Sequence, residues 1–284
     1  MNLRCRQFTV PLDPKTLLMG IVNITEDSFS GDGLLATDEN VVEKVGRLRN
    51  DGMDITDVGG ETARTNRGPI SEQEEINRVC PAIEQLVARF PDLPISVNTW
   101  RPKVVDAALQ AGAHIVNDIG GLPDDTNARL AARHGASLVI MHTQGEPKVP
   151  HTHVKYPDVM ADMLAWFEQK ISLAMKAGLI HEQILLDPGL DFAKQLDDNL
   201  HVIRHLSELK RFSCPLLLAP SRKTVIGDIL GVPPAGRDAG TAALCVLGIQ
   251  GGADVLRVHN VRAMRDVARM TDAILRSPSA ARAI

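Results

Sequence analysis

Residues 17–23 read Leu-Leu-Met-Gly-Ile-Val-Asn, an almost wholly apolar run that ends in one polar side chain, Asn23. A run of this length without polar alternation is typical of a strand buried on both faces of a parallel sheet. Seven more short runs follow it: Met53–Asp57, Ile95–Asn98, His114–Asp118, Leu138–His142, Ile184–Asp187, Leu216–Ser221 and Val255–His259. The sequence therefore predicts eight parallel strands.

The stretches between these runs have the spacing of amphipathic helices. In Ser71–Phe90, for example, Val79 and Ile83 share one face, and Ser71 with Glu74 can form a capping box. Strand followed by helix, eight times, is the pattern of a single (β/α)8 TIM barrel in the α/β class. An open doubly wound sheet also alternates strands with helices, but eight near-regular units and the lack of a GxGxxG turn favour the barrel.

The chain is expected to form one domain over residues 1–284, because no Ser/Gly linker or change of composition divides it. Within it, residues 1–14 are interpreted as an N-terminal extension and residues 277–284 as a disordered tail. The longest connection, residues 144–158, is rich in Pro, His and Gly and precedes a long helix predicted over Val159–Ala177. A lid over the barrel mouth is the hypothesis for that connection.

Composition excludes several classes of partner. Hydrophobic residues make up 44% of the chain and charged residues 23%, as in a globular protein with a full core. A formal net charge of -4 predicts no nucleic-acid surface, and no apolar run approaches the roughly 18 residues of a membrane helix. Four dispersed cysteines, with no CxxC pair and no secretory segment, indicate reduced packing residues in a cytoplasmic protein.

Polar side chains stand at the carboxyl ends of the predicted strands, where barrels carry their chemistry. These ends are Asn23, Asp57, Asn98, Asn117 with Asp118, His142, Asp187, Ser221 and His259. Any single Asn, Asp or Ser there could instead cap the following helix. Capping explains the two histidines poorly, so the set predicts a polar pocket.

Cations and glycines indicate the chemistry of the ligand. Ser221-Arg222-Lys223 and Arg257-Val258-His259 bring three cations to the last two strand ends, where barrels most often bind phosphate. The glycines of residues 23–33 and 57–64 permit close backbone approach, and their polar side chains offer oxygen ligands for Mg²⁺. An anionic, phosphate-bearing ligand is predicted.

These segments resemble the motifs of the dihydropteroate synthase family. Asn23–Ser30 is similar to N-x-T-x-D-S-F-S, and Asp57–Arg64 is similar to D-x-G-G-E-[ST]-x-R. The resemblance continues, in order, through Asn117-Asp118, Met141-His142, Asp187-Pro188-Gly189, Phe192, Lys194, Ser221-Arg222-Lys223 and Arg257-Val258-His259. It spans about Leu17–Leu275 and implies a pterin-binding barrel that is usually a homodimer.

The reaction implied by the resemblance joins 6-hydroxymethyl-7,8-dihydropterin diphosphate to 4-aminobenzoate and releases pyrophosphate, with Mg²⁺. Departure of pyrophosphate leaves a positively charged methylene, which the site stabilises electrostatically and the amine attacks. No protein nucleophile is needed.

The resemblance also implies roles for individual residues. Asp187, Asn117 and Asn98 would bond the pterin edge, and Lys223 would lie against its other side. Arg257, His259 and Asn23 would hold the diphosphate, Asn23 as the Mg²⁺ ligand, with Asp27 and Asp32 as helpers. The catalytic residues would be Asp187, Lys223 and Arg257, and further substrate contacts would come from Asp57, Thr62, Arg64, Phe192, Ser221 and Arg222.

Several positions depart from the family pattern. Asn98 stands where the family usually has Asp, and this neutral amide is expected to cost roughly 1 kcal/mol of pterin binding. The other departures are Gly31-Asp32, Ala63, Thr65-Asn66, Asp191 and Asn260. Because Thr65-Asn66 replaces Pro-Gly, a changed loop stiffness and sulfonamide affinity is a further hypothesis.

Three rival functions are kept beside the synthase. The first is a synthase-like paralogue that binds pterin without synthase activity, which is favoured by Asn98, Ala63, Thr65 and Asp191. The second is a pterin-dependent methyltransferase, which the complete cationic segments disfavour. A non-enzymatic binding module would leave the polar ring and its cations idle.

Overall fold

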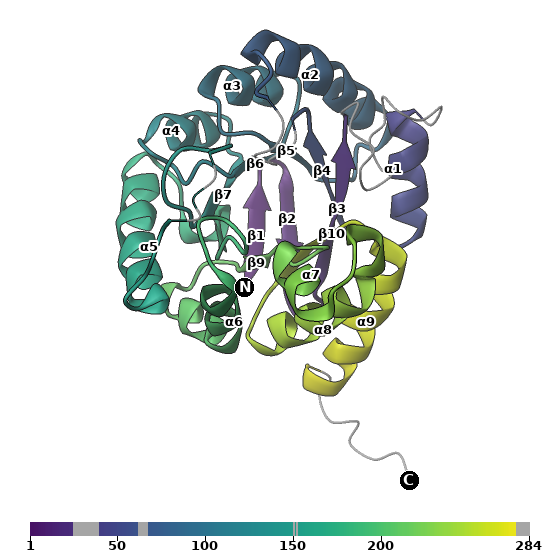
Figure 1. Cartoon of the computed structure of the whole chain (residues 1–284). Helices are drawn as coiled ribbons and strands as arrows, with labels where there is room; N and C mark the ends of the chain where they lie inside the picture. Colours follow the sequence, from purple (N-terminus) through teal and green to yellow (C-terminus); the bar gives the residue numbers. More distant parts are fainter. Residues whose placement is uncertain (25–39, 62–67, 150, 152, 277–284) are drawn as a thin grey trace.

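Eight parallel strands form one sheet in a computed structural model that describes residues 1–24, 40–61, 68–149, 151 and 153–276. Their order is β8-β7-β6-β5-β4-β3-β10-β9. The strands are β3 (Leu17–Asn23), β4 (Ile55–Gly59), β5 (Ile95–Asn98), β6 (Ile115–Asp118), β7 (Ser137–Met141), β8 (Ile184–Asp187), β9 (Leu217–Leu218) and β10 (Val255–Val258). A parallel bridge between Leu186 and Leu216 brings the two outer strands together, so the sheet curls into the predicted single (β/α)8 barrel (Figure 1).

Helices surround the sheet, as Figure 1 shows. They are α1 (Val41–Asn50), α2 (Glu72–Arg89), α3 (Pro102–Gln110), α4 (Thr126–Arg133), α5 (Val159–Lys176), α6 (Leu196–Arg204), α7 (Thr224–Leu230), α8 (Asp238–Gln250) and α9 (Val261–Leu275). The predicted start of α2 is confirmed, since the Ser71 side chain accepts a hydrogen bond from the Glu74 N–H. Among the described residues, none of the helices is both long and apolar enough for a bilayer.

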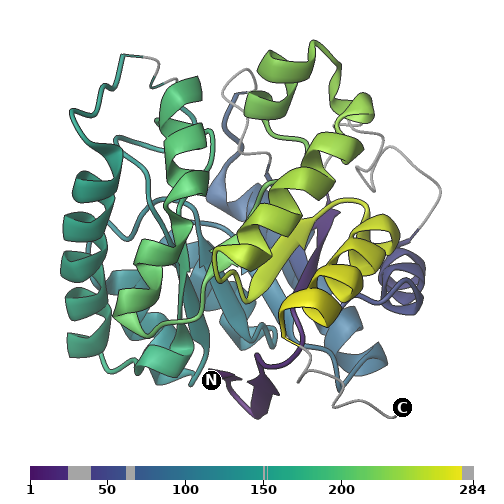
Figure 2. The ribbon, with the colours of Figure 1, turned by 90° about the horizontal axis from the view of Figure 1, so that it is seen from below.

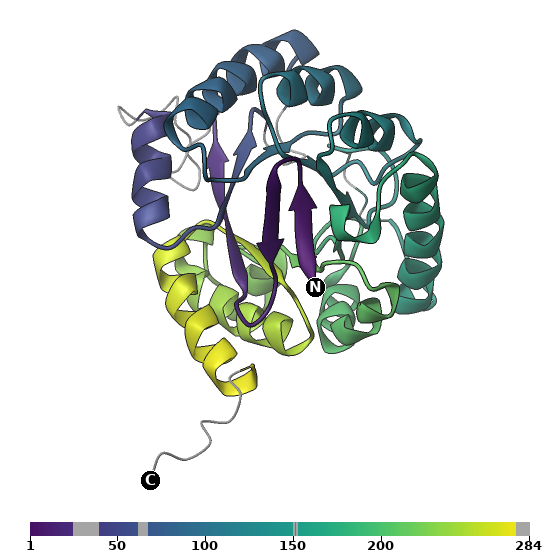
Figure 3. The same ribbon diagram turned by 180° about the vertical axis from the view of Figure 1, so that it is seen from behind.

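Residues 1–14 are more than the expected extension, because they form an antiparallel hairpin of β1 (Asn2–Cys5) and β2 (Phe8–Pro11). Leu3, Cys5 and Leu12 are fully buried and pack on barrel residues such as Met19. The hairpin covers the amino end of the barrel (Figures 2 and 3). The strand carboxyl ends lie at the opposite end and stay free of it.

Most strand bounds agree with the sequence expectation to within one residue, and β4 and β9 are the exceptions. The structure has β4 over Ile55–Gly59 instead of Met53–Asp57, so Asp57 is inside the strand. Strand β9 spans only Leu217–Leu218 instead of Leu216–Ser221. Pro215 and Pro220 flank it, and proline has no N–H for a strand ladder. The four cysteines are free, and Cys5, Cys214 and Cys245 are buried, as predicted.

Candidate active site

A buried carboxylate, Asp57 on β4, organises the strand ends. It has no exposed surface and accepts hydrogen bonds from Ser96 Oγ at 2.6 Å and Arg257 Nε at 2.7 Å. Asn117 Nδ2 at 3.2 Å and Asn98 Nδ2 at 3.4 Å complete the set. Because these donors come from β5, β6 and β10, Asp57 fixes the side chains of three other strands in one place.

Asn117 keeps one hydrogen-bonding group unused. The side chain is 2% exposed, its amide nitrogen is bound to Asp57, and its Oδ1 has no hydrogen-bond partner among the described residues. An unsatisfied buried acceptor costs about 1 to 3 kcal/mol. A ligand that donates an N–H at this point would remove that cost.

Asp187, at the end of β8, is the second buried carboxylate of the pocket. It is 4% exposed, and its Oδ1 accepts a hydrogen bond from Gly189 N at 2.8 Å. Burial raises the pKa of Asp187, while the Gly189 N–H and the nearby charges of Lys223 and Arg257 act in the opposite direction. A carboxylate held in this way suits a ligand with paired N–H donors.

Lys223 and Phe192 form a cation–π pair beside that carboxylate. The Lys223 Nζ lies 4.4 Å from the centroid of the Phe192 ring. Desolvation lowers the pKa of Lys223, and the carboxylates of Asp191 and Asp187 partly offset this. The site therefore presents an ammonium and an aromatic face to the same space.

A second lysine of the family motif, Lys194, has a structural role. It is 7% exposed, and its Nζ donates to the carbonyl oxygens of His142, Gly189 and Phe192, each at 3.1 Å. Burial lowers the pKa of Lys194 to about 7. Its three hydrogen bonds fix the loop that carries Phe192.

The last two strand ends are linked by a serine and a histidine. Ser221 Oγ lies 2.8 Å from His259 Nδ1 and accepts from His259 N at 3.1 Å. Arg222 has left-handed backbone, φ 57°, and its Nε donates to Asp238 of α8 at 3.0 Å. Its predicted substrate contact stays a prediction, since the described contact of its side chain is this ion pair.

Asn23 ends β3 next to β4, where a glycine gives it room. Its Oδ1 lies 3.4 Å from the position that a Cβ on Gly59 would occupy. No group of three His, Cys, Asp or Glu side chains within the described ranges gathers as for a protein-only metal site. The predicted contacts Thr62 and Arg64, like Asp27, Asp32, Ala63, Thr65 and Asn66, lie outside the described residues.

Two predicted strand ends turn away from the pocket, which corrects the sequence interpretation. Asp118 accepts from Asn127 of α4 at 2.9 Å, because successive residues of a strand face opposite sides and Asn117 faces the barrel interior. His142 lies against α5, with Nε2 3.2 Å from Asp162. Burial lowers the pKa of His142 to about 2, so the ring is neutral.

An ion-pair cluster behind the loop after β4 was not predicted from the sequence. Glu61 accepts from Arg101 at 2.6 Å and from Lys148 at 3.0 Å, and Arg101 also bonds Glu75. Burial opposes ionisation of Glu61, but these hydrogen bonds hold its pKa below the usual value. The partners are 40 and 87 residues from Glu61, so no local pattern could reveal them. Lys148 joins the predicted lid, residues 144–158, to the loop after β4.

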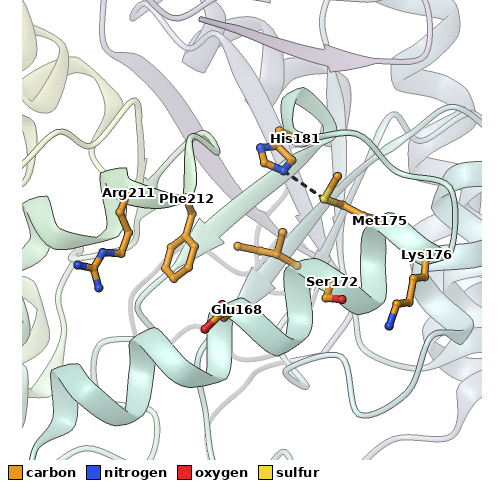
Figure 4. Close-up of a pocket in the computed structure, with 8 residues that line it drawn as sticks. Glu168, Ser172, Met175, Lys176, His181, Arg211 and Phe212 are labelled. Carbon is orange, nitrogen blue, oxygen red and sulfur yellow. Dashed lines mark hydrogen bonds between the residues drawn. The ribbon is translucent and has the colours of Figure 1, made fainter.

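A separate surface hollow of about 540 Å³ lies between α5 and the segments that precede β8 and β9 (Figure 4). It is lined by Glu168, Ile171, Ser172, Met175, Lys176, His181, Arg211 and Phe212. His181 and Phe212 precede β8 and β9, so the hollow lies toward the amino end of the strands. It is remote from the polar ring.

Comparisons with known proteins agree on the class of this site. The family model described as "Pterin binding enzyme" matches residues 19–259. The dihydropteroate synthase of Synechocystis is 40% identical over 264 residues, which cover 92% of this chain and 91% of that protein. A dihydropteroate synthase of Yersinia pestis in a sulfonamide drug complex superposes with a TM-score of 0.88, at 37% identity, over 96% of this chain and 98% of the other. The Thermus thermophilus synthase in complex with 4-aminobenzoate gives 0.85, at 34% identity, over 96% and 100%.

Barrel and polar ring together thus define a pterin-binding barrel enzyme. The chain belongs, within that class, to the dihydropteroate synthase family, which consists of transferases of folate biosynthesis.

Proposed function

We propose that this chain condenses 6-hydroxymethyl-7,8-dihydropterin diphosphate with 4-aminobenzoate to give 7,8-dihydropteroate and pyrophosphate. The observation that carries the proposal is the open hydrogen-bonding edge at Asn117 and Asp187, facing the same pocket as Lys223. A pterin ring has donors and acceptors along one edge that such groups can bind. Membership of the family supports the same ligand.

Recognition of the ring is assigned to three strand ends. Asp187 accepts from ring N–H groups, and the free Oδ1 of Asn117 accepts one more. Asn98, held toward Asp57 at 3.4 Å, lines the same edge. Lys223 packs on the opposite side of the ring with Phe192.

The diphosphate is assigned to the cationic end of β10. Arg257 uses Nε for Asp57, and the rest of its guanidinium is left to bind phosphate oxygens, with His259 beside it. We propose that Mg²⁺ binds here through Asn23. One protein oxygen fits this ion, which is usually held by one or two protein ligands together with substrate phosphates. The metal would neutralise charge on the leaving pyrophosphate.

The residues then act by position and charge. Arg257 and His259 stabilise the departing pyrophosphate, and Asp187 holds the N–H edge of the ring so that the cationic methylene stays in place on the opposite side. The aminobenzoate ring is assigned to the space by Phe192, Ser221 and Lys223, where its amine can reach that carbon. The sulfonamide in the Yersinia pestis complex supports sulfonamides as inhibitors of this chain.

We propose a homodimer formed through the outer faces of α7, α8 and α9. These faces expose large apolar side chains, namely Ile229 (55%), Leu230 (50%), Leu247 (47%), Met270 (65%) and Ile274 (69%). Large exposed apolar side chains on neighbouring helices favour a protein interface there. The four free cysteines support a reducing, cytoplasmic location.

The test is to incubate the pure protein with the dihydropterin diphosphate, Mg²⁺ and 4-aminobenzoate, and to measure pyrophosphate and dihydropteroate. Both products in equal amounts are expected. Pterin binding without either product would instead identify a paralogue that has lost the synthase reaction.

A further inference from the structure

Asp191, in the loop after β8, has a backbone conformation that favours glycine. Its φ is 67°, in the left-handed region, where Asp is tolerated better than most side chains. A side chain held there at some conformational cost is a candidate for a specific use. The contacts of its carboxylate identify that use.

The Asp191 carboxylate caps a helix 33 residues away in the chain. Its Oδ2 accepts from Thr224 N, and its Oδ1 accepts from Val225 N at 3.3 Å. These are the first two residues of α7, and the N-cap residue Lys223 makes no side-chain capping bond of its own. Asp191 therefore supplies from another loop the cap that the sequence of α7 lacks.

A buried asparagine of α6 holds Asp191 in place. Asn199, 2% exposed, accepts from Asp191 N at 2.8 Å and donates to its Oδ1 at 3.4 Å. Its amide also donates to Gln195 O at 3.0 Å. The carboxylate is thus fixed before any ligand arrives.

The two residues of the cation–π pair are each adjacent in sequence to this contact. Phe192 follows Asp191, and Lys223 precedes Thr224, so the bond to Thr224 fixes both backbones together. The charged groups that face Lys223 are Asp191, Asp187, Arg257 and Lys194. Of these, the two carboxylates stabilise its ammonium, and the two cations oppose it.

We propose that Asp191 is a positioning residue for Lys223. It holds the lysine over Phe192 by capping α7 and keeps the ammonium charged by adding a carboxylate beside it. Only the expected effect on kcat/KM rests on the proposed function, and the positioning of Lys223 does not. This role would explain why the chain differs from the family pattern at Asp191. The chain lacks the family's carboxylate at position 98 and carries another carboxylate, that of Asp191, near Lys223.

The experiment compares wild type with Asp191→Asn, which removes charge but keeps shape, and Asp191→Gly, which removes the cap but suits the backbone. Asp197→Asn, an exposed acid in the first turn of α6, is the control for loss of one charge. The pKa of Lys223 is read from its ¹³Cε NMR signal, assigned with Lys223→Met, and kcat/KM is measured as a function of pH. The NMR titration needs no activity.

Both Asp191 variants should lower the Lys223 pKa by about half a unit or more. They should reduce kcat/KM about 5-fold, and the alkaline limb of its pH profile should move to lower pH. Asp197→Asn should match wild type in all three. An unchanged Lys223 pKa, or unchanged kcat/KM in an active background, overturns the inference. A wild type without synthase activity refutes the proposed function alone, and the NMR titration still decides the position of Asp191.

Discussion

Two acids of strand β4 and its amino-terminal approach, Asp54 and Asp57, have different uses. Asp54, just before the strand, accepts from Lys15 Nζ at 2.5 Å, from Leu18 N at 2.8 Å and from Arg265. Arg265 in turn donates to backbone carbonyls, so every bond closes within the chain. Asp57, two residues before the carboxyl end of β4, binds donors such as Asn117, whose side-chain oxygen has no partner among the described residues. Polar residues at the amino end stabilise the barrel, and those at the carboxyl end are arranged for a ligand.

Asp54→Ala should have the largest effect of the changes proposed for this comparison, and on stability alone. The substitution leaves the Arg265 guanidinium without its carboxylate partner, so the free energy of unfolding should fall by roughly 3 kcal/mol. Chemical denaturation measures this, and turnover per folded molecule should stay at the wild-type value. Asp51→Ala, which removes an exposed pair with Arg262, is the control and should cost well under about 1 kcal/mol.

Lys223→Met should give the converse result. Loss of a charged contact to substrate is expected to lower dihydropteroate formation about 100-fold, while unfolding changes little because a desolvated cation is removed. Lys194→Met is the matched variant, and it should destabilise the fold, since three carbonyl groups lose their donor. Equal stability losses in the two variants would contradict the separation of roles.

Low pH should destabilise the fold at the amino end of the barrel through protonation of His114. The ring of His114 contacts Gln7 of the hairpin at 3.1 Å. Burial lowers the pKa of His114 to about 4, below the ordinary value near 6.5 of an unfolded chain. The unfolded state thus binds more protons between these values, and stability present above pH 6.5 is lost as the pH falls.

The loss should reach at most about 1.4 kcal/mol for the first pH unit below 6.5. Denaturation at pH 7.5 and 5.5 measures it for wild type, for His114→Gln and for the exposed control His153→Gln. The histidine contribution should vanish in His114→Gln. A wild-type pH dependence in that variant would place the titrating group elsewhere, with buried His142 the next to test.

Asn98→Asp should have the smallest effect. The substitution should raise the affinity for pterin and lower the stability of the ligand-free protein. A charged acceptor at the pterin edge should raise pterin affinity several-fold, or about 1 kcal/mol. The new carboxylate would face Asp57 across the present 3.4 Å contact, so stability without ligand should drop. Calorimetric titration and denaturation measure the two, with the exposed Asn77→Asp as control. Unchanged affinity would remove Asn98 from the pterin site.

The sequence predicts the barrel well because buried parallel strands leave a local signal. The bounds of β3, β5 and β8 are the same as those of the predicted runs. Each of these strands ends in a polar residue, among them Asn23 and Asp187. The hairpin of residues 1–14 was missed as an element, since its Leu3 and Cys5 are buried only by contact with the barrel.

Side-chain direction was harder to predict than position. Asp118 and His142 stand at strand ends as expected, yet the two-residue period of a strand and the packing of α5 turn them outward. The roles of Lys194 and Asp191 depend on hydrogen-bond partners in other loops. A local sequence pattern holds no information about such distant partners.

The most direct test of the division between the two ends is calorimetric titration of 6-hydroxymethyl-7,8-dihydropterin diphosphate, with Mg²⁺, into folded Asp54→Ala and Asp187→Ala. The amino-end variant should bind like wild type, and the carboxyl-end variant should bind about 100-fold more weakly, since a charged partner of the pterin edge is lost. Wild-type affinity in Asp187→Ala, or an equal loss in both variants, would contradict the assignment of pterin recognition to the strand carboxyl ends.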